Sequence, residues 1–216
     1  GNSMKKQNPT ILITYANLLQ NLKIVSASDS PVLTYDEAED KAEEYRHAWA
    51  KKEQLILSGM QESMALTFNA PLIDVALAPW TYGSAVSFPL IVDMSREPDE
   101  FIDVLTHELF HQLFSDNQII TSRNARAQSR LKWNELFGNE HSGGTLVHIA
   151  IHAALKYIYL DVHHESYRLE RDIDHSKHLP DYAKAWEYVE RNDYKAIIEK
   201  LKKRYREVEM EQSQGN

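Results

Sequence analysis

An apolar segment at residues 101–114 carries two histidines and a glutamate within five residues, and this combination constrains the fold more than any other feature of the chain. Pro98, followed by two acidic residues, predicts that a helix begins there. Apolar residues lie on most sides of that helix, which is typical of a buried central helix. His107, Glu108 and His111 interrupt the apolar surface. Buried polar groups are costly without partners, so these three side chains need hydrogen bonds or a metal ion.

The spacing of the three residues indicates a metal site. His107 and His111 lie about one helical turn apart on one face, where both imidazoles reach a single tetrahedral ion. Glu108 lies beside that face, where it can hold a proton from a metal-bound water molecule. A shuffled chain of this composition contains about 0.04 such motifs by chance. The alternative is a pair of buried histidines that neighbouring carboxylates satisfy.

Residues 107–113 closely resemble the active-site helices of zinc metallopeptidases of the zincin type. The resemblance implies a bound Zn²⁺ ion and hydrolysis of peptide bonds, with Glu108 as general base. It also implies an α+β, zincin-like fold: a small, mostly antiparallel sheet, a central motif helix and a mainly helical C-terminal half. No His or Gly after His111 completes the metzincin pattern. This leaves a gluzincin-type arrangement, whose third ligand is a glutamate on a second helix, with an acid four residues later.

The expected second helix, from residue 145 to about 161, carries histidines at that spacing instead. We assign His148 as the third ligand, and His152 either as a hydrogen-bond partner of the ligands or as the true ligand. Glu140 and His141, just before a pair of glycines, are the competing candidates.

Other residues with suitable chemistry have less specific patterns. Hydrolysis also requires a side chain, such as Tyr or His, that stabilises the oxyanion of the tetrahedral intermediate. The sequence offers four candidates and does not choose among them: His141, Tyr157, His163 and Tyr82. Each of them is also typical of a packed structural residue. Residues 163–165 and 172–178 contain further histidines and acids, which we interpret as a polar connection between helices rather than a second metal site. Residues 82–90 are expected to form the sheet edge along which a peptide substrate adds as a strand.

The remaining elements follow from periodicity and turn residues. Residues 10–25 form a helix, or a helix followed by a short strand. A capping box at residues 34–37 predicts a long helix to about residue 64. Two strands, at 72–77 and 85–92, form a hairpin joined around residues 79–83, with Pro89 at an edge or a bulge. Residues 117–143 are irregular, and 165–208 form two or three amphipathic helices.

Composition limits the remaining possibilities. The chain lacks cysteine, which excludes thiolate zinc ligands, and its net charge of −8 argues against nucleic-acid binding. No apolar run approaches the roughly 20 residues of a membrane span. We expect one zincin-like domain over residues 1–216, with an α/β part at about 10–116, a helical part at about 117–210 and a tag remnant at 1–3.

The expected partner is a peptide or protein substrate, with no nucleic acid and no membrane, in the cytoplasm. The sequence does not indicate the oligomeric state. Two other functions remain open: a non-catalytic zincin-fold binding or regulatory protein with a structural metal, and a metal-dependent hydrolase of a non-peptide amide.

Overall fold

The computed structural model describes residues 7–16, 33–79, 85–120 and 129–215. These residues form four strands, eight α-helices and a short π-helix, so the α+β class expected from the sequence is confirmed. The chain divides into two compact units. The first comprises Gly1–Leu57 with Phe68–Gln112, and the second comprises Ser58–Thr67 with Leu113–Asn216.

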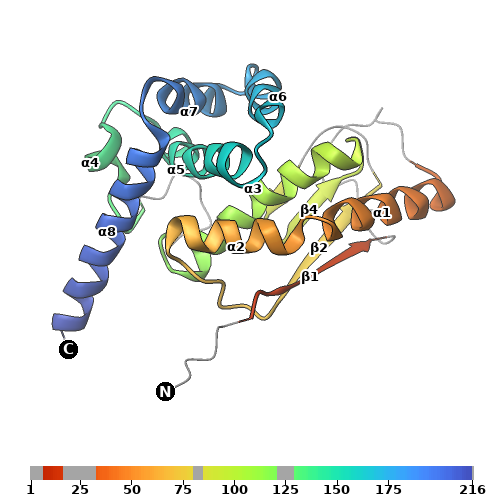
Figure 1. The fold of residues 1–216 in the computed structure, drawn as a ribbon, viewed down its shortest axis with the longest axis horizontal. Helices are drawn as coiled ribbons and strands as arrows, with labels where there is room; N and C mark the ends of the chain where they lie inside the picture. The colour runs from red at the N-terminus through yellow and green to blue at the C-terminus, as the bar shows by residue number, and fades with distance from the viewer. Residues whose placement is uncertain (1–6, 17–32, 80–84, 121–128, 216) are drawn as a thin grey trace. The chain divides into compact units, whose positions relative to one another are not determined.

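The first unit contains a mixed sheet in the order β1-β2-β4-β3 (Figure 1). Strand β1 (Thr10–Tyr15) pairs in parallel with β2 (Leu72–Ala78), and β2 pairs in parallel with β4 (Leu90–Asp93). Of the described strands, only β3 (Ala85–Ser87) is antiparallel, beside β4. The expectation of a mostly antiparallel sheet is therefore wrong. Helical crossovers allow a chain to re-enter a sheet in its original direction, and two helices separate β1 from β2 in the sequence.

Two expected strand and helix assignments are also wrong. The hairpin does not join residues 72–77 to residues 85–92; it lies within the second segment, where Phe88 and Pro89 form the turn between β3 and β4. Pro89 cannot donate a ladder hydrogen bond, so it suits that turn. Residues 10–15 are a strand rather than a helix, and residues 17–25 of that prediction lie outside the described residues.

The long helix expected after the capping box consists of two helices, α1 (Tyr35–Ala50) and α2 (Glu53–Met64). The predicted cap itself is confirmed, because the Thr34 side chain accepts a hydrogen bond from the Glu37 backbone N–H. Lys51 and Lys52 form the turn between the two helices.

The core of the first unit contains buried residues of the sheet, of α1 and of α3 (Pro98–Asp116). Tyr45 on α1 stacks on Phe101 of α3, with ring centroids 4.3 Å apart, and its hydroxyl donates to the Arg96 carbonyl oxygen at 2.5 Å. The pair fixes α1 against the start of α3. In β2 the buried residues Ile73, Val75 and Leu77 alternate with more exposed neighbours, as in a sheet that is covered on one face, and the last residues of β2 and β4, Ala78 and Asp93, are buried as well.

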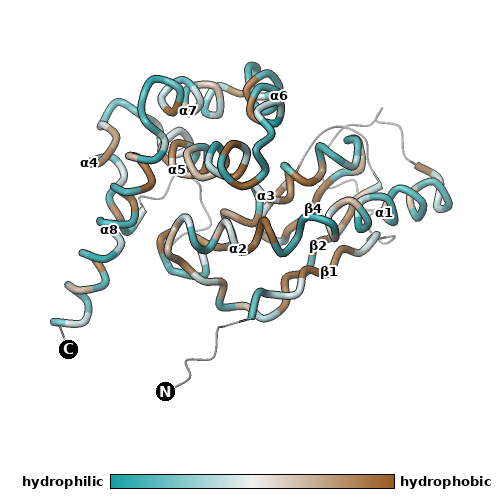
Figure 2. The backbone as a smooth tube through the Cα atoms, viewed as in Figure 1, coloured by the Kyte–Doolittle hydropathy of each residue, from teal (hydrophilic) through white to brown (hydrophobic). Residues whose placement is uncertain are grey.

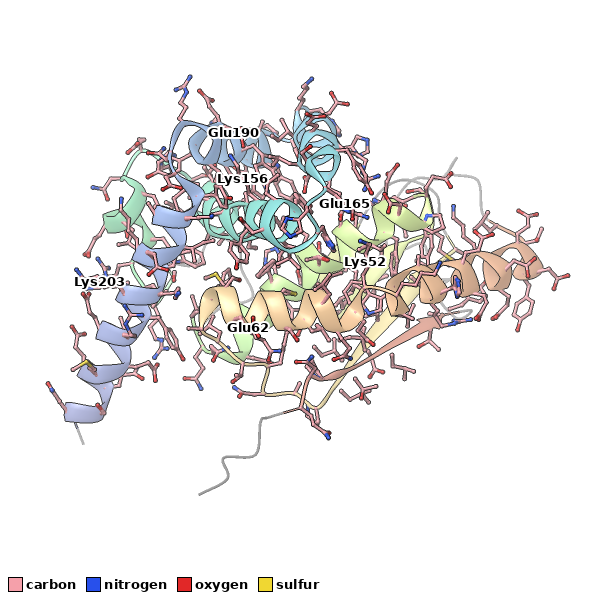
Figure 3. The ribbon with its side chains drawn as sticks, in the orientation of Figure 1. Lys52, Glu62, Lys156, Glu165, Glu190 and Lys203 are labelled. Carbon is pink, nitrogen blue, oxygen red and sulfur yellow. The ribbon has the colours of Figure 1, made fainter. Side chains whose placement is uncertain are left out.

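Helix α5 (Gly143–Tyr157) is the core element of the second unit. It contacts α4 (Trp133–Phe137), α7 (Pro180–Arg191) and α8 (Tyr194–Gln214), and it continues into the π-helix η2 (Ile158–Val162). Figure 2 shows its hydrophobic colouring, whereas the C-terminal half of α8 is largely hydrophilic. Lys156 and Glu190, both labelled in Figure 3, form an ion pair of 2.9 Å between α5 and α7. With α6 (Ser166–Ser176), the second unit has three helices after η2, where the sequence predicted two or three over residues 165–208.

Among the described residues, Gly143–Val162 is the one helical stretch whose length and composition would allow it to cross a membrane. Its most apolar window is 67% buried inside the protein. Core helices of soluble proteins pass the same test, so this is weak evidence for a membrane span.

The carboxylate of Asp172 connects three helical elements of the second unit. It accepts hydrogen bonds from the Tyr159 hydroxyl of η2 at 2.6 Å, the Ser176 hydroxyl of α6 at 3.2 Å and the Trp186 indole N–H of α7 at 3.4 Å. Burial raises the pKa of Asp172, and the three hydrogen bonds together with nearby His175 only partly oppose that increase. The residue thus belongs to a packed helix rather than to the polar connection expected from the sequence.

Substitution of Asp172 should therefore change how stability depends on pH. Because the pKa in the folded protein lies above the unfolded value of about 3.9, Asp172 contributes most below about pH 4, and that contribution is lost as the pH rises through the folded pKa. Asp172→Asn keeps the shape of the side chain without its charge. Its free energy of unfolding should therefore rise relative to that of the wild type between pH 4 and pH 7. Asp172→Ala should destabilise the protein by about 1–3 kcal/mol for each buried donor left without an acceptor.

Urea unfolding at several pH values measures these differences. The matched control is Asp174→Asn on the same helix, an exposed position whose pKa is lowered by Lys177. It should lose stability relative to the wild type, if at all, as the pH rises. An Asp172→Asn curve parallel to the wild-type curve would contradict this account.

Candidate metal centre

Helix α3 places the residues of the histidine motif in the interior. It begins at Pro98 with acidic residues in its first turn, as expected from the sequence. His107 is 8% exposed and Glu108 is 6% exposed, whereas His111 is half-buried. The rings of His107 and His111 have centroids 5.3 Å apart, as expected for residues one helical turn apart on one face.

The N-terminus of α5 is fixed by a polar cluster. Ser142 caps the helix by accepting from the Thr145 backbone N–H at 3.1 Å. The Ser142 and Thr145 hydroxyls both donate to one carboxylate oxygen of Asp181, on α7, at 2.8 Å and 3.1 Å. A Cβ atom on Gly144 would lie 2.3 Å from the other oxygen of that carboxylate, so a larger residue at this position would displace the Asp181 side chain.

The carbonyl group of Gly144 determines the tautomer of His148. Its Nδ1 lies 2.7 Å from the Gly144 carbonyl oxygen, which can only accept, so Nδ1 carries the proton and Nε2 keeps its lone pair. Burial lowers the pKa of His148 to about 4, against the opposing effects of this hydrogen bond and of Asp181. A neutral imidazole with a fixed ring orientation is the form that binds metal ions.

Three histidines lie close enough to bind one metal ion. His107, His111 and His148 each offer a ring nitrogen, and these atoms all lie within 4.8 Å of one another. Ligands of a tetrahedral zinc ion, at about 2.0–2.1 Å from the metal, are roughly 3.4 Å apart. An all-imidazole set suits zinc, copper, iron or nickel. Three protein ligands with an open fourth position are typical of catalytic zinc sites.

The competing third ligands occupy other surroundings. His152 is fully buried and stacks on Trp186, with ring centroids 4.1 Å apart and an interplanar angle of 16°. His141 lies 3.2 Å from the Phe137 carbonyl oxygen and 3.3 Å from Glu140, whose side chain is 73% exposed. The grouping found among the described residues contains His148 and none of these three.

The carboxylate of Glu108 has a hydrogen-bond partner from the neighbouring hairpin. The Ser87 hydroxyl, at the end of β3, donates to Glu108 Oε2 at 2.6 Å. Burial raises the pKa of Glu108 to about 6, and this hydrogen bond and the charge of Arg96 oppose the increase. Gln112, one turn further along α3, donates to the Ser87 carbonyl oxygen, also at 2.6 Å.

The expected oxyanion-stabilising residues have different local surroundings. His141 packs edge-on against Tyr188, Tyr157 is half-buried at the end of α5, and His163 is buried just after η2. Tyr82 lies outside the described residues. Of the other polar residues expected near the helix connections, His164 and His175 are exposed.

Sequence reasoning missed several neighbours of the candidate ligands. The half-buried ring of Tyr182 lies 4.0 Å from the ring of His148, between centroids, at an interplanar angle of 36°. Trp186 stacks on His152, and Ser87 and Gln112 lie at Glu108. Only Gln112, next to His111 in the sequence, had a position that marked it as a neighbour of the motif.

No protein-family model, curated protein or solved structure matches this chain. Inference about its function therefore depends on the chemistry of the site itself.

Metal analysis after dialysis should find about one transition-metal ion per chain. His148→Ala should weaken binding by more than the roughly 10–100-fold that loss of an outer-shell partner costs, because it removes a ligand atom. His152→Phe, which keeps an aromatic ring on Trp186, should retain the metal. The reverse result, retention by His148→Ala and loss by His152→Phe, would make His152 the ligand.

Proposed function

We propose that this chain is a zinc-dependent metallopeptidase that hydrolyses peptide bonds, with Glu108 as general base. The main support is the group of three imidazole nitrogens within 4.8 Å, together with a buried carboxylate adjacent to one of the ligands in the sequence. The proposal corresponds to a gluzincin-type site in which His148 replaces the usual glutamate.

The proposed chemistry assigns a separate task to each residue. A zinc ion bound there supplies a Lewis acid and lowers the pKa of a coordinated water molecule. The imidazoles of His107, His111 and His148 would hold the ion and leave a fourth position open for the substrate. Glu108 takes up a proton at its carboxylate and returns it to the leaving amine, so that a peptide is cleaved to a carboxylate and an amine.

Strand β3 is the proposed contact for the substrate backbone. Among the described strands it lies at an edge of the sheet and pairs only with β4. An extended peptide can add to such an edge by main-chain hydrogen bonds. The position of Ser87 supports this choice, because its hydroxyl contacts Glu108 and thus relates the edge strand to the proposed base.

The two alternatives differ from this proposal in measurable ways. A binding protein with a structural metal has no need of a buried carboxylate beside the ligands, so Glu108 favours hydrolysis. A hydrolase of non-peptide amides would use the same residues, and only the choice of substrate separates it from a peptidase.

Glu108→Gln should keep the metal and lower the rate of peptide cleavage about 10²- to 10⁴-fold, because the amide cannot take up the proton. The assay combines metal analysis with cleavage of a peptide library by the zinc-loaded protein, and Glu100→Gln on the same helix is the control. Cleavage of simple amides but of no peptide would favour the non-peptide hydrolase. A metal-loaded wild type that cleaves neither would favour the binding protein.

A further inference from the structure

Two hydrogen bonds connect one residue of β3 to one face of α3. The Ser87 hydroxyl donates to Glu108 Oε2, and the Gln112 side-chain amide donates to the Ser87 carbonyl oxygen, both at 2.6 Å. Glu108 and Gln112 lie four residues apart, so they present their side chains on the same side of the helix. The end of the strand is therefore bound to the helix at both its side chain and its backbone.

The direction of each bond follows from its chemistry. An ionised carboxylate can only accept, so the Ser87 hydroxyl must donate, and this hydroxyl–carboxylate bond is of the short, charge-assisted kind. The terminal torsion of a glutamate has broad preferences, so a carboxylate without such a bond has several orientations available. The hydroxyl engages Oε2 and leaves Oε1 for other partners.

We propose that Ser87 is a positioning residue for the carboxylate of Glu108 and that Gln112 fixes the Ser87 backbone for this purpose. This inference rests on the proposed hydrolytic function. Ser87 acts through Glu108: its hydroxyl orients the carboxylate, and Gln112 keeps that hydroxyl within reach by binding the carbonyl group of the same residue. The end of β3 and the base thus form one unit.

The surroundings of Ser87 favour this positioning role over the alternative that its contacts merely anchor β3 to α3. Its neighbours Val86 and Phe88 are 46% and 43% exposed, so the strand end gains little from apolar burial there. The two polar contacts are the ones that the structure records between the end of β3 and α3. One of them ends on the carboxylate beside the candidate ligands rather than on a surface group.

The kinetic test compares three substitutions in the zinc-loaded full chain. Ser87→Ala should lower kcat for peptide cleavage about 10- to 100-fold with little change in KM or zinc content, because misplacing a reacting group slows the chemical step. Ser87→Thr keeps the hydroxyl and should restore most of the rate. Ser95→Ala, at an exposed serine of the same unit, is the matched control. A Ser87→Ala enzyme with the wild-type kcat would overturn the inference.

A second readout does not depend on activity. With ¹³C-labelled glutamate, the infrared difference between a protein and its Glu108→Gln variant isolates the Glu108 carboxylate stretch. We expect this band to shift and broaden in Ser87→Ala and to resemble the wild-type band in Ser87→Thr. Gln112→Met, which removes the donor to the Ser87 carbonyl at similar size, should give a smaller change in the same direction.

The two readouts separate the two hypotheses. An identical carboxylate band in Ser87→Ala and in the wild type overturns the positioning role, whether or not peptides are cleaved. A shifted band in a metal-loaded protein that cleaves no peptide supports the positioning of Glu108 and overturns the proposed peptidase function.

Discussion

The burial of ionisable side chains on an apolar helix is the constraint on which the candidate site depends. His107 and Glu108 are almost fully buried on α3, among residues such as Leu105 and Leu109 that are fully buried. Without partners, such groups would cost several kcal/mol of stability. The hydrogen-bond partner of the Glu108 carboxylate is Ser87, which lies in a β-hairpin. The environment of this carboxylate therefore depends on where the hairpin packs.

The second unit also buries an ionisable side chain, His148, and satisfies it by a hydrogen bond within its own helix. His148 is buried on α5, and its Nδ1–H is satisfied within the helix by the Gly144 carbonyl oxygen, four residues earlier. Histidine side chains in a helix point towards the N-terminus, so this carbonyl group is within reach. Asp181 binds the residues that cap α5 and leaves no room for a side chain at position 144. The imidazole of His148 is thus oriented by a carbonyl group of its own helix, at a helix N-terminus that Asp181 contacts.

The sequence predicted these helices well because their signals are local. The proline and acids at the start of α3, the apolar residues of α5 and the histidine spacing on α3 all act within a few residues. The sheet was predicted poorly. Strand direction depends on the path between strands, and the helices that separate β1 from β2 lie in the segment predicted as one long helix. Phe88 and Pro89 were assigned to a strand because a short apolar run conceals a tight turn.

The choice between His148 and His152 illustrates a second limit. Both lie on one stripe of α5, and helical spacing cannot distinguish them. Their surroundings can, because His152 stacks on Trp186, whereas His148 belongs to the three-histidine group. Trp186 lies on α7, more than 30 residues further along the chain, so this contact leaves no local signal in the sequence.

Ser87 belongs to the same class of residue as Trp186. A serine at the end of a three-residue strand has no pattern that marks it, and its contact with Glu108 arises only when the hairpin packs on α3. Residues that bind a metal ion must have particular chemistry and spacing, which a sequence displays. Residues that orient them need only one donor or acceptor in the right place, and many residue types at many positions supply one. The candidate ligands were therefore accessible from the sequence, whereas the residues proposed to orient Glu108 required the fold.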